Sequence, residues 1–442
     1  MNKRAIVGMM VLAFLGILIS PFVFSGEVFA QVGIKAFLPE QKGEATERLV
    51  QVIDSLKEKG FDDPTLLFGS KSQMAMRVLE GGKQPAPEQP KPEEPKEQEP
   101  APELPGDQEP APQQPAPQPT PANDLWVLGY TVIDYQGDQR SHNSVVKYGS
   151  SMSHIAPFTY RIDAKGNLTN TTPLPTATVN EAKKQGVKPL VLIHNYDNGF
   201  DKDTARAMMK SPEARANLIN QLVKLIEENG YAGVNVDIEG IYVADRPLYS
   251  LMLKEMKEVL GPKGYLLTVA IPAKTSDDLK NAWSGGYDYK EIGKYADKIL
   301  LMTYDQYWIG GPPGPVASII WTENVIKYAV KEIDPKKLLL GLATYGYDWS
   351  EPGKGKALSY PQALAKAKEF NATVKWHDRY QVPYFFYKGN DGKEHQVWFE
   401  NEESARIKLQ LVSKYGLGGV GVWKLGNETA RYWKVLDDNL GK

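Results

Sequence analysis

Two carboxylates stand two residues apart in an apolar run near the middle of the chain. Asn235, Asp237 and Glu239 alternate there with Val and Ile residues. A β-strand turns successive side chains to opposite faces, so the three polar side chains share one face of a strand. Burying an unpaired carboxylate costs free energy or raises its pKa. The pair is therefore either a salt-bridged strand end or a site where a carboxylic acid transfers a proton.

The surrounding sequence predicts the frame that would hold these residues. From residue 124 onward, apolar strand-like runs alternate with helical patterns, which predicts an α/β fold, a (β/α)8 TIM barrel. A doubly wound sheet is the alternative, but no glycine-rich turn follows the first strand. The predicted strands are residues 126–132, 152–160, 187–194, 233–239, 266–271, 299–304, 338–345 and 419–423. The predicted helices include residues 203–228, 248–260, 323–332, 360–369 and 403–415.

The gap between the seventh and eighth predicted strands is roughly twice the others. It contains an aromatic-rich stretch, residues 376–400, around the turn Gly389-Asn-Asp-Gly392. This pattern predicts a small α+β insertion with a β-hairpin. Its aromatic side chains could line a sugar groove or form the insertion's own core.

Other side chains fall near the carboxyl ends of the predicted strands, where barrel enzymes carry their active sites. Tyr304 and Asp305 end the sixth strand, Trp423 ends the eighth, and Glu239 ends the fourth. These side chains are expected to converge on the barrel mouth. Met302 alternates inward below Tyr304, a position that also fits simple filling of the barrel.

Several motifs resemble glycoside hydrolase family 18. That family's fourth-strand signature is D-G-x-D-x-D-x-E, and residues 232–239 match it at the glycine, the last Asp and the Glu. The family's sixth-strand M-x-Y-D matches residues 302–305. Three further stretches look like the branch associated with spore germination and cortex lysis: residues 155–160, 345–349 and 418–426. The resemblance covers residues 124–442 almost completely.

The resemblance implies a retaining, substrate-assisted mechanism, which needs no enzyme nucleophile. Glu239 would protonate the glycosidic oxygen and then act as base on water. Asp237 would orient the 2-acetamido group of the substrate and stabilise the charge that develops on it. Tyr304 would donate a hydrogen bond to the acetamido carbonyl, and Trp423 would form the floor under the sugar. No metal and no cofactor are implied.

The chain departs from the family signature at two positions. Asn235 replaces the middle Asp, which removes a negative charge that would help to keep Asp237 protonated. The expected result is a lower pKa of Asp237 and an altered pH profile without loss of activity, because Asn235 could still form a hydrogen bond with Asp237. Ala232 replaces the first Asp, with an expected effect on structure alone.

A second group of residues is expected to contact the substrate near the strand ends. Tyr130, Asn195, Tyr345 and Asp305 could bind sugar hydroxyls or could pack locally. Met302 and Trp423 complete the set of expected substrate contacts.

The N-terminal part predicts three further segments. Residues 1–30 combine Lys3-Arg4, an apolar run and Val28-Phe29-Ala30, which is typical of a secretory signal peptide. An uncleaved membrane anchor is the alternative. Residues 31–82 resemble a small helical peptidoglycan-binding module, against a structural or disordered extension. Residues 83–123 form a Pro/Glu/Gln-rich disordered linker, which leaves residues 124–442 for the catalytic barrel.

Composition excludes several other classes. The formal net charge of -2 provides no basic excess for a nucleic-acid partner. The chain has no cysteine, so disulfides and thiolate metal sites are impossible, and its five histidines lack the spacing of a zinc hydrolase.

The sequence therefore predicts a secreted, monomeric hydrolase associated with the cell wall or spore envelope, which does not contact the membrane once the signal is removed. Its expected partner is a polysaccharide containing N-acetylglucosamine. Peptidoglycan is the first expectation for the substrate, and chitin or its oligosaccharides the second. A non-catalytic, lectin-like glycan-binding protein and a structural envelope protein are the rival readings. Endo or exo action is left open.

Overall fold

The computed structural model describes residues 125–441 of the 442-residue chain. The predicted signal peptide, helical module and linker lie outside the described residues. Within residues 125–441, no helix is long and apolar enough to cross a membrane.

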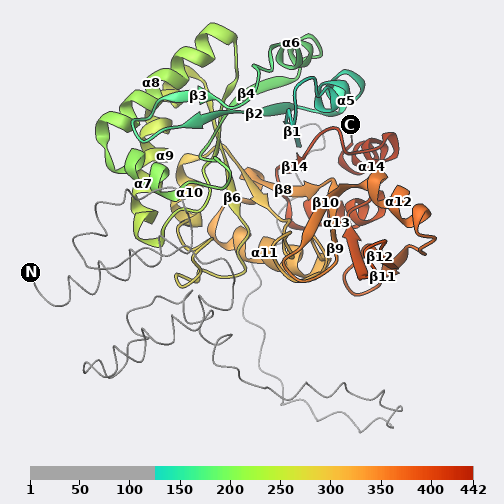
Figure 1. The fold of residues 1–442 in the computed structure, drawn as a ribbon. Coiled ribbons are helices and arrows are strands. Elements are labelled where there is room, and N and C mark those ends of the chain that lie inside the picture. The colour runs from blue at the N-terminus through green and yellow to red at the C-terminus, as the bar shows by residue number, and fades with distance from the viewer. Residues whose placement is uncertain (1–124, 442) are drawn as a thin grey trace, which may run out of the picture. The chain divides into compact units, whose positions relative to one another are not determined.

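Eight parallel strands close into a barrel in the order β1-β14-β8-β7-β6-β5-β4-β2, and β2 pairs with β1. The strands occupy the centre of the ribbon and the helices lie around them (Figure 1). The short strand β3 (Leu168–Asn170) is added antiparallel to β2. The barrel strands are β1 (Trp126–Thr131), β2 (His154–Ile162), β4 (Lys188–His194), β5 (Gly233–Asp237), β6 (Leu266–Pro272), β7 (Lys298–Met302), β8 (Leu338–Ala343) and β14 (Gly419–Trp423). The predicted (β/α)8 barrel is confirmed.

Helices cover the outside of the barrel and bury the apolar face of its strands. They are α5 (Arg140–Tyr148), α6 (Thr176–Lys184), α7 (Lys202–Lys210), α8 (Pro212–Asn229), α9 (Arg246–Leu260), α10 (Tyr289–Tyr295), α11 (Ile319–Glu332), α13 (Glu402–Tyr415) and α14 (Ala430–Leu440). The main core lies between these helices and the strands, and a smaller apolar cluster that includes Leu128, Leu192 and Leu300 fills the barrel interior.

The helix predicted over residues 203–228 is two helices, α7 and α8. The break falls at Ser211-Pro212, because a proline cannot supply the N–H group of a helix interior but fits the first turn of a new helix. The Ser211 hydroxyl accepts a hydrogen bond from the Ala214 N–H (3.1 Å) and caps α8. The helix-breaking signal was therefore present in the sequence.

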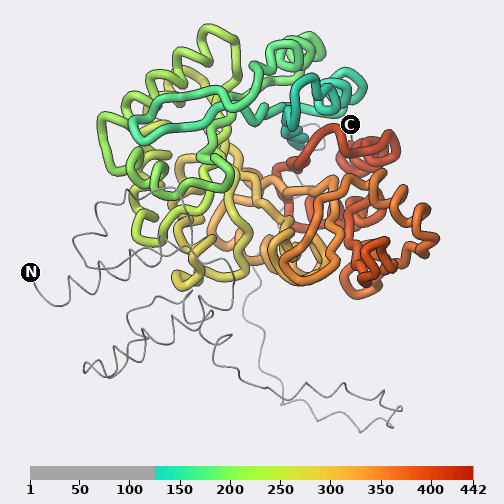
Figure 2. The backbone as a smooth tube through the Cα atoms, in the orientation of Figure 1, coloured from blue at the N-terminus to red at the C-terminus, as the bar shows by residue number. Residues whose placement is uncertain are grey.

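The predicted insertion between the seventh and eighth barrel strands is confirmed and is larger than the hairpin alone. Its five antiparallel strands run in the order β10-β9-β13-β12-β11. Residues 345–399, orange to orange-red in the tube, lie at the right-hand side of the molecule beside the barrel strands (Figure 2). Its elements are β9 (Tyr345–Trp349), β10 (Gly355–Ser359), α12 (Tyr360–Glu369), β11 (Lys375–His377), β12 (Val382–Lys388) and β13 (Glu394–Phe399).

Most aromatic side chains of the insertion form cores. Phe385 and Phe399 are buried under α12, and Trp398 belongs to a cluster that reaches Tyr304 and Trp423 at the barrel mouth. Phe386 is exposed. The insertion therefore packs against the mouth and supplies part of its wall.

Candidate active site

Strand β5 carries its polar residues on one face, as its alternation predicts. Val234, Val236 and Ile238 are fully buried in the core between barrel and helices, so Asn235 and Asp237 point to the opposite side, the barrel interior. Glu239 lies two residues beyond the end of the strand and is only partly buried. The fold thus places a carboxyl group at the mouth directly above a buried one.

Asp237 is 5% exposed, and its Oδ1 accepts no hydrogen bond within the described part of the chain. Burial raises the pKa of Asp237 to about 7. A buried carboxyl group without a cation prefers to keep its proton, because the ionised form loses the hydration it has in water. Asp237 is therefore poised to exchange a proton near neutral pH.

Asn235 does not form the hydrogen bond with Asp237 that the sequence predicted. Its amide group donates to the Thr268 Oγ1 (2.8 Å), and its own Oδ1 has no donor among residues 125–441. Asn235 and Asp237 thus each leave one acceptor oxygen unsatisfied on the same strand face. A proton on the Asp237 carboxyl is the group that would relieve this shortage of donors.

Glu239 is held through its backbone. The Asn195 side chain accepts from the Glu239 N–H (2.8 Å) and donates to the Glu239 carbonyl oxygen (2.9 Å) and to the Asp201 carbonyl oxygen (3.0 Å). Asn195 is 1% exposed, so its amide is fully used. Asn195 therefore positions Glu239, which is the local packing role that the sequence left open beside a sugar contact.

The pKa of the Glu239 carboxyl is raised well above its usual value. Burial is the largest cause, followed by the negative charges of Asp237 and Asp305. Since each factor disfavours the ionised form, Glu239 holds its proton to a higher pH than an exposed glutamate does. This is the property required of a general acid at neutral pH.

Tyr304 and Met302 reach the mouth from the end of β7, and both side chains remain partly exposed. Burial raises the pKa of Tyr304 well above its usual value, and the neighbouring Tyr130 and Asp237 add to this. The Tyr304 hydroxyl is therefore a hydrogen-bond donor at all ordinary pH values. Met302 lies against the apolar cluster inside the barrel, which fits a filling role.

Trp423 is partly exposed at the end of β14, and two aromatic rings hold it edge-on. The rings of Tyr130 and Phe158 lie 5.6 and 5.8 Å from it. Tyr130 is 1% exposed, so it lies below the surface of the mouth. Phe158 was not singled out from the sequence, although it lies in one of the motifs recognised there. The two rings fix the plane that Trp423 offers to the mouth.

His194 supports Phe158 from the other side and was also missed. The two rings stack at 4.0 Å. Burial lowers the pKa of His194 to about 4, so the imidazole is neutral, and its Nδ1 accepts the Tyr196 N–H (3.0 Å). Nothing in the local sequence distinguishes His194 from a surface histidine, because its partner comes from another strand.

Asp305 lies exposed at the mouth, with φ of 57°. The hydroxyls of Tyr345 and Tyr347 both donate to its Oδ1, at 2.6 and 2.7 Å. The sequence left a sugar contact and local packing both open for Tyr345, and in the structure its hydroxyl orients Asp305. Tyr347 was not predicted. Strand β9 of the insertion thus sets the position of a carboxylate on the barrel.

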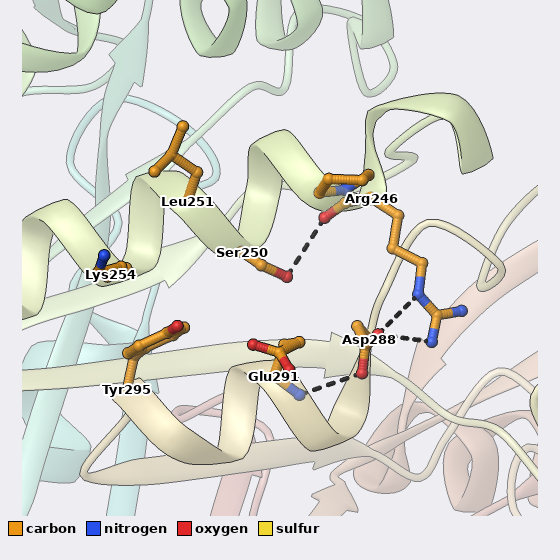
Figure 3. Close-up of a pocket in the computed structure, with 8 residues that line it drawn as sticks. Arg246, Ser250, Leu251, Lys254, Asp288, Glu291 and Tyr295 are labelled. Carbon is orange, nitrogen blue, oxygen red and sulfur yellow. Dashed lines mark hydrogen bonds and ion pairs between the residues drawn. The ribbon is translucent and has the colours of Figure 1, made fainter.

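A hollow of about 370 Å³ lies away from these residues, on the outer wall between α9 and α10 (Figure 3). Its polar groups bond to one another: Arg246 pairs with Asp288 (3.0 Å), and the Ser250 hydroxyl donates to the Arg246 carbonyl oxygen (3.2 Å). Its chemistry is that of a helix–helix contact. Within residues 125–441, no three His, Asp or Glu side chains are grouped closely enough to hold a metal ion.

The mouth of the barrel therefore joins a partly buried carboxyl group with a raised pKa, a fully buried carboxyl group, a phenol donor and a partly exposed indole ring. A general acid above an apolar platform suits cleavage of a bond to a sugar, because the indole can stack on the ring while the acid protonates the leaving oxygen.

Comparison with known proteins also indicates an enzyme that cleaves a bond to a sugar. The chain is 34% identical over 314 residues to the uncharacterized glycosylase YvbX of Bacillus subtilis (strain 168), which spans 70% of this chain and 90% of that protein. The chitinase from Chromobacterium violaceum ATCC 12472 superposes with a TM-score of 0.68 at 30% identity and covers 72% of this chain and 99% of its own. The Bacillus cereus spore cortex-lytic enzyme SleL superposes with a TM-score of 0.67 at 28% identity and covers 71% of this chain and 74% of its own. The family model for glycosyl hydrolases family 18 matches residues 133–428. The chain belongs to glycosyl hydrolases family 18.

Proposed function

We propose that this glycoside hydrolase cleaves β-1,4 bonds next to N-acetylglucosamine in peptidoglycan, in the spore cortex or the cell wall. The observation that carries the proposal is the partly buried Glu239, whose pKa is raised and whose backbone is clamped by Asn195 beside Asp237. The reaction is retaining and substrate-assisted, so that the acetamido oxygen of the substrate attacks the anomeric carbon.

Glu239 donates its proton to the glycosidic oxygen of the leaving sugar and then removes a proton from the water that completes hydrolysis. Such acid–base catalysis contributes about 10²–10⁴-fold to a rate. Its efficiency depends on the pKa of the acid, and burial together with two carboxylate neighbours raises the pKa of Glu239 well above its usual value.

Asp237 and Tyr304 act on the 2-acetamido group. Asp237 accepts the amide N–H and stabilises the positive charge that develops as the carbonyl oxygen attacks, and the Tyr304 hydroxyl donates to that oxygen. Trp423 stacks under the same sugar, held by Tyr130 and Phe158. Asp305, oriented by Tyr345, contacts a sugar hydroxyl at the edge of the mouth.

The substrate class rests on the relatives. They include a spore cortex-lytic enzyme and proteins named as cortical fragment-lytic enzymes, and this favours peptidoglycan. Secretion by residues 1–30, wall binding by residues 31–82 and a spacer at 83–123 belong to the same proposal, which places the enzyme in the spore envelope or outside the cell as a monomer.

Chitin is the second candidate. The observation that favours it is the chitinase of Chromobacterium violaceum, which this chain covers over 99% of its length at 30% identity. A chitin chain also carries the acetamido group at every sugar, so the same Asp237 and Tyr304 would serve.

The experiment is product analysis by mass spectrometry. Purified wild type, Glu239→Gln and the control Glu258→Gln, which changes an exposed glutamate of α9, are each incubated with peptidoglycan fragments and with chitin oligosaccharides. We expect new reducing-end N-acetylglucosamine from peptidoglycan with the wild type and the control, and none with Glu239→Gln. Release from chitin oligosaccharides alone would support a chitinase. Binding of both glycans without any product would overturn hydrolysis in favour of a lectin.

A further inference from the structure

Lys202 lies beside the proposed acid. It is the first residue of α7, and its aliphatic chain packs on Gly240, where an added Cβ would lie 2.8 Å from the Lys202 Cε. Gly240 directly follows Glu239 in the chain. The side chain of Lys202 therefore runs along the loop that carries the acid.

The ammonium group of Lys202 has no carboxylate partner within residues 125–441. It lies 5.6 Å from the ring centre of Trp283 and 5.6 Å from that of Tyr242, and its one hydrogen bond, to the Ala282 carbonyl oxygen, is long at 3.4 Å. An ammonium group bound to aromatic faces keeps its full charge and its attraction for an anion.

The charges around Lys202 are already matched with one another. Arg206 pairs with Asp245 (2.5 Å), and Arg161 pairs with Asp197 (2.7 Å). Asp201 and Asp203, which flank Lys202 in the chain, also have hydrogen-bond partners.

Asp201 accepts the Asp203 and Thr204 N–H groups at the start of α7, and Asp203 accepts the Tyr242 hydroxyl (3.1 Å). Among residues 125–441, Lys202 is therefore a partly exposed cation without a carboxylate partner, in a surrounding where the other charges are paired.

An exposed aromatic surface continues from this cation. Trp283 and Tyr196 are each 44% exposed, and Phe200 links them, with ring centres 5.9 and 5.3 Å away. These rings come from the loops after β4 and β6. Aromatic faces next to a cation suit a sugar that carries a negative charge, because the ring stacks while the charge pairs.

The position of this surface relates it to the leaving sugar. In the proposed reaction, one sugar stacks on Trp423, and Glu239 protonates the oxygen that links it to the next sugar. That next sugar must lie on the Glu239 side, next to Lys202 and Trp283. In peptidoglycan, N-acetylglucosamine alternates with N-acetylmuramic acid, whose O3 substituent ends in a carboxylate or in a peptide with carboxylates. Chitin carries none.

We propose that Lys202 binds a carboxylate of the muramoyl residue at the leaving-sugar position and so selects peptidoglycan over chitin; this inference rests on the proposed function. The carboxylate comes either from the lactyl group or from the attached peptide. Lys202 is thus a specificity-determining residue, and the aromatic surface of Tyr196, Phe200 and Trp283 supports the sugar that bears the charge.

The test compares kcat/KM on matched tetrasaccharides of alternating N-acetylglucosamine and N-acetylmuramic acid. One form has free lactyl carboxylates, one has them converted to amides, and one carries peptides. Wild type, Lys202→Gln, Lys202→Arg and Lys210→Gln are measured, the last as a control at the other end of α7. We expect the wild type, Lys202→Arg and Lys210→Gln to prefer a carboxylate form over the amide by about tenfold, which corresponds to about 1.4 kcal/mol.

Lys202→Gln is expected to lose this preference, and in the wild type the preference is expected to shrink between about 50 mM and 500 mM NaCl because salt screens exposed charges. A preference for the lactyl carboxylate alone, or for the peptide form alone, identifies the source. An unchanged preference in Lys202→Gln, or an equal loss on all forms, would overturn the inference.

If the wild type hydrolyses none of the tetrasaccharides, the proposed function fails. The inference about Lys202 is then decided by calorimetric affinity for the same compounds. Tighter binding of a carboxylate form by the wild type and not by Lys202→Gln supports it, and equal affinities refute it.

Discussion

Two aspartates of this molecule are equally hidden and have opposite surroundings. Asp237 at the end of β5 is 5% exposed, and Asp348 in β9 of the insertion is 3% exposed. Asp348 accepts the Tyr387 hydroxyl (2.6 Å), contacts the His395 Nδ1 (2.8 Å) and pairs with Lys366 (3.5 Å). The Asp348 carboxylate thus has hydrogen-bond and ion-pair partners, as buried polar groups usually do.

Among residues 125–441, no such donor or cation reaches the Asp237 Oδ1, and burial raises the pKa of Asp237 to about 7. The sequence around each aspartate is a strand rich in aromatic or β-branched residues, so neither burial nor the type of the neighbouring residues distinguishes the two. Only their hydrogen-bond and ion-pair partners differ. A buried carboxyl group that is left unsatisfied marks a site that uses its proton, whereas a satisfied one holds two elements together.

The largest expected effect is on catalysis. Asp237→Asn should reduce kcat by about 10²–10³-fold, because the amide cannot stabilise the positive charge that develops on the acetamido group. KM should change less than kcat, since the lost interaction strengthens during the reaction. Steady-state kinetics on peptidoglycan fragments checks this, with circular dichroism as the control for folding. A kcat within threefold of the wild type would remove Asp237 from the mechanism.

The same substitution in the insertion should have the reverse outcome. Asp348→Asn leaves Tyr387, His395 and Lys366 with poorer partners and should lower the free energy of unfolding by about 2 kcal/mol. Activity per folded molecule should stay within twofold of the wild type, because these side chains belong to the sheet and the helix of the insertion. Chemical denaturation and kinetics at a temperature where the variant is folded test the two statements. Lost activity with unchanged stability would show that Asp348 also serves the mouth.

A third expected effect concerns stability at Asp237. Its pKa of about 7 in the folded state lies above the ordinary value for Asp, so the folded state binds this proton more tightly than the unfolded state. The free energy of unfolding therefore falls as the pH rises from about 4 to about 7 and then levels off. In Asp237→Asn the side chain cannot ionise, so the free energy of unfolding does not fall for this reason as the pH rises.

Relative to the wild type, Asp237→Asn should gain about 2–3 kcal/mol between pH 5 and pH 8, because the cost of burying its own amide group is the same at both pH values and cancels. The difference in melting temperature between variant and wild type, measured at both pH values, reports this gain. A constant difference at both pH values would mean that Asp237 ionises without cost.

The alternation of side chains along β5 was enough to predict where Asp237 and its neighbours in the site lie. Alternation placed Asn235, Asp237 and Glu239 on one face, and the order of strands and helices predicted the barrel that brings Tyr304 and Trp423 to the same mouth. These are local patterns, and each was visible within a few residues. The insertion was predicted from the spacing of two strands for the same reason.

The hydrogen-bond partners of the site residues could not be predicted in this way, because they come from distant segments of the chain. Asn195 holds Glu239 across 44 positions, and the Tyr345 and Tyr347 hydroxyls meet Asp305 across 40 and 42. A hydrogen-bond partner at such a separation leaves no trace in local periodicity. For this reason the sequence could name the residues at the strand ends but could not tell which touch the sugar and which hold another residue.

The smallest expected effect is on the pH profile of Asn235→Asp. A carboxylate at this position faces the same side of β5 as Asp237, and like charges raise each other's pKa, here by about 0.5–1 unit. The acidic limb of kcat/KM should then move to higher pH, since Asp237 keeps its proton longer and its carboxylate is the form that stabilises the developing positive charge.

Asn235 donates to the Thr268 hydroxyl, so Asn235→Asp changes a hydrogen bond as well as a charge. Thr268→Val separates the two causes, because it removes that hydroxyl and adds no charge. Thr268→Val should lower kcat/KM without moving the acidic limb. If both variants shift the limb equally, the hydrogen bond controls Asp237. If Asn235→Asp does not shift this limb of the pH profile, the pKa of Asp237 depends on burial alone. Asp237 and Asp348 would then differ only in whether the carboxylate has hydrogen-bond and ion-pair partners.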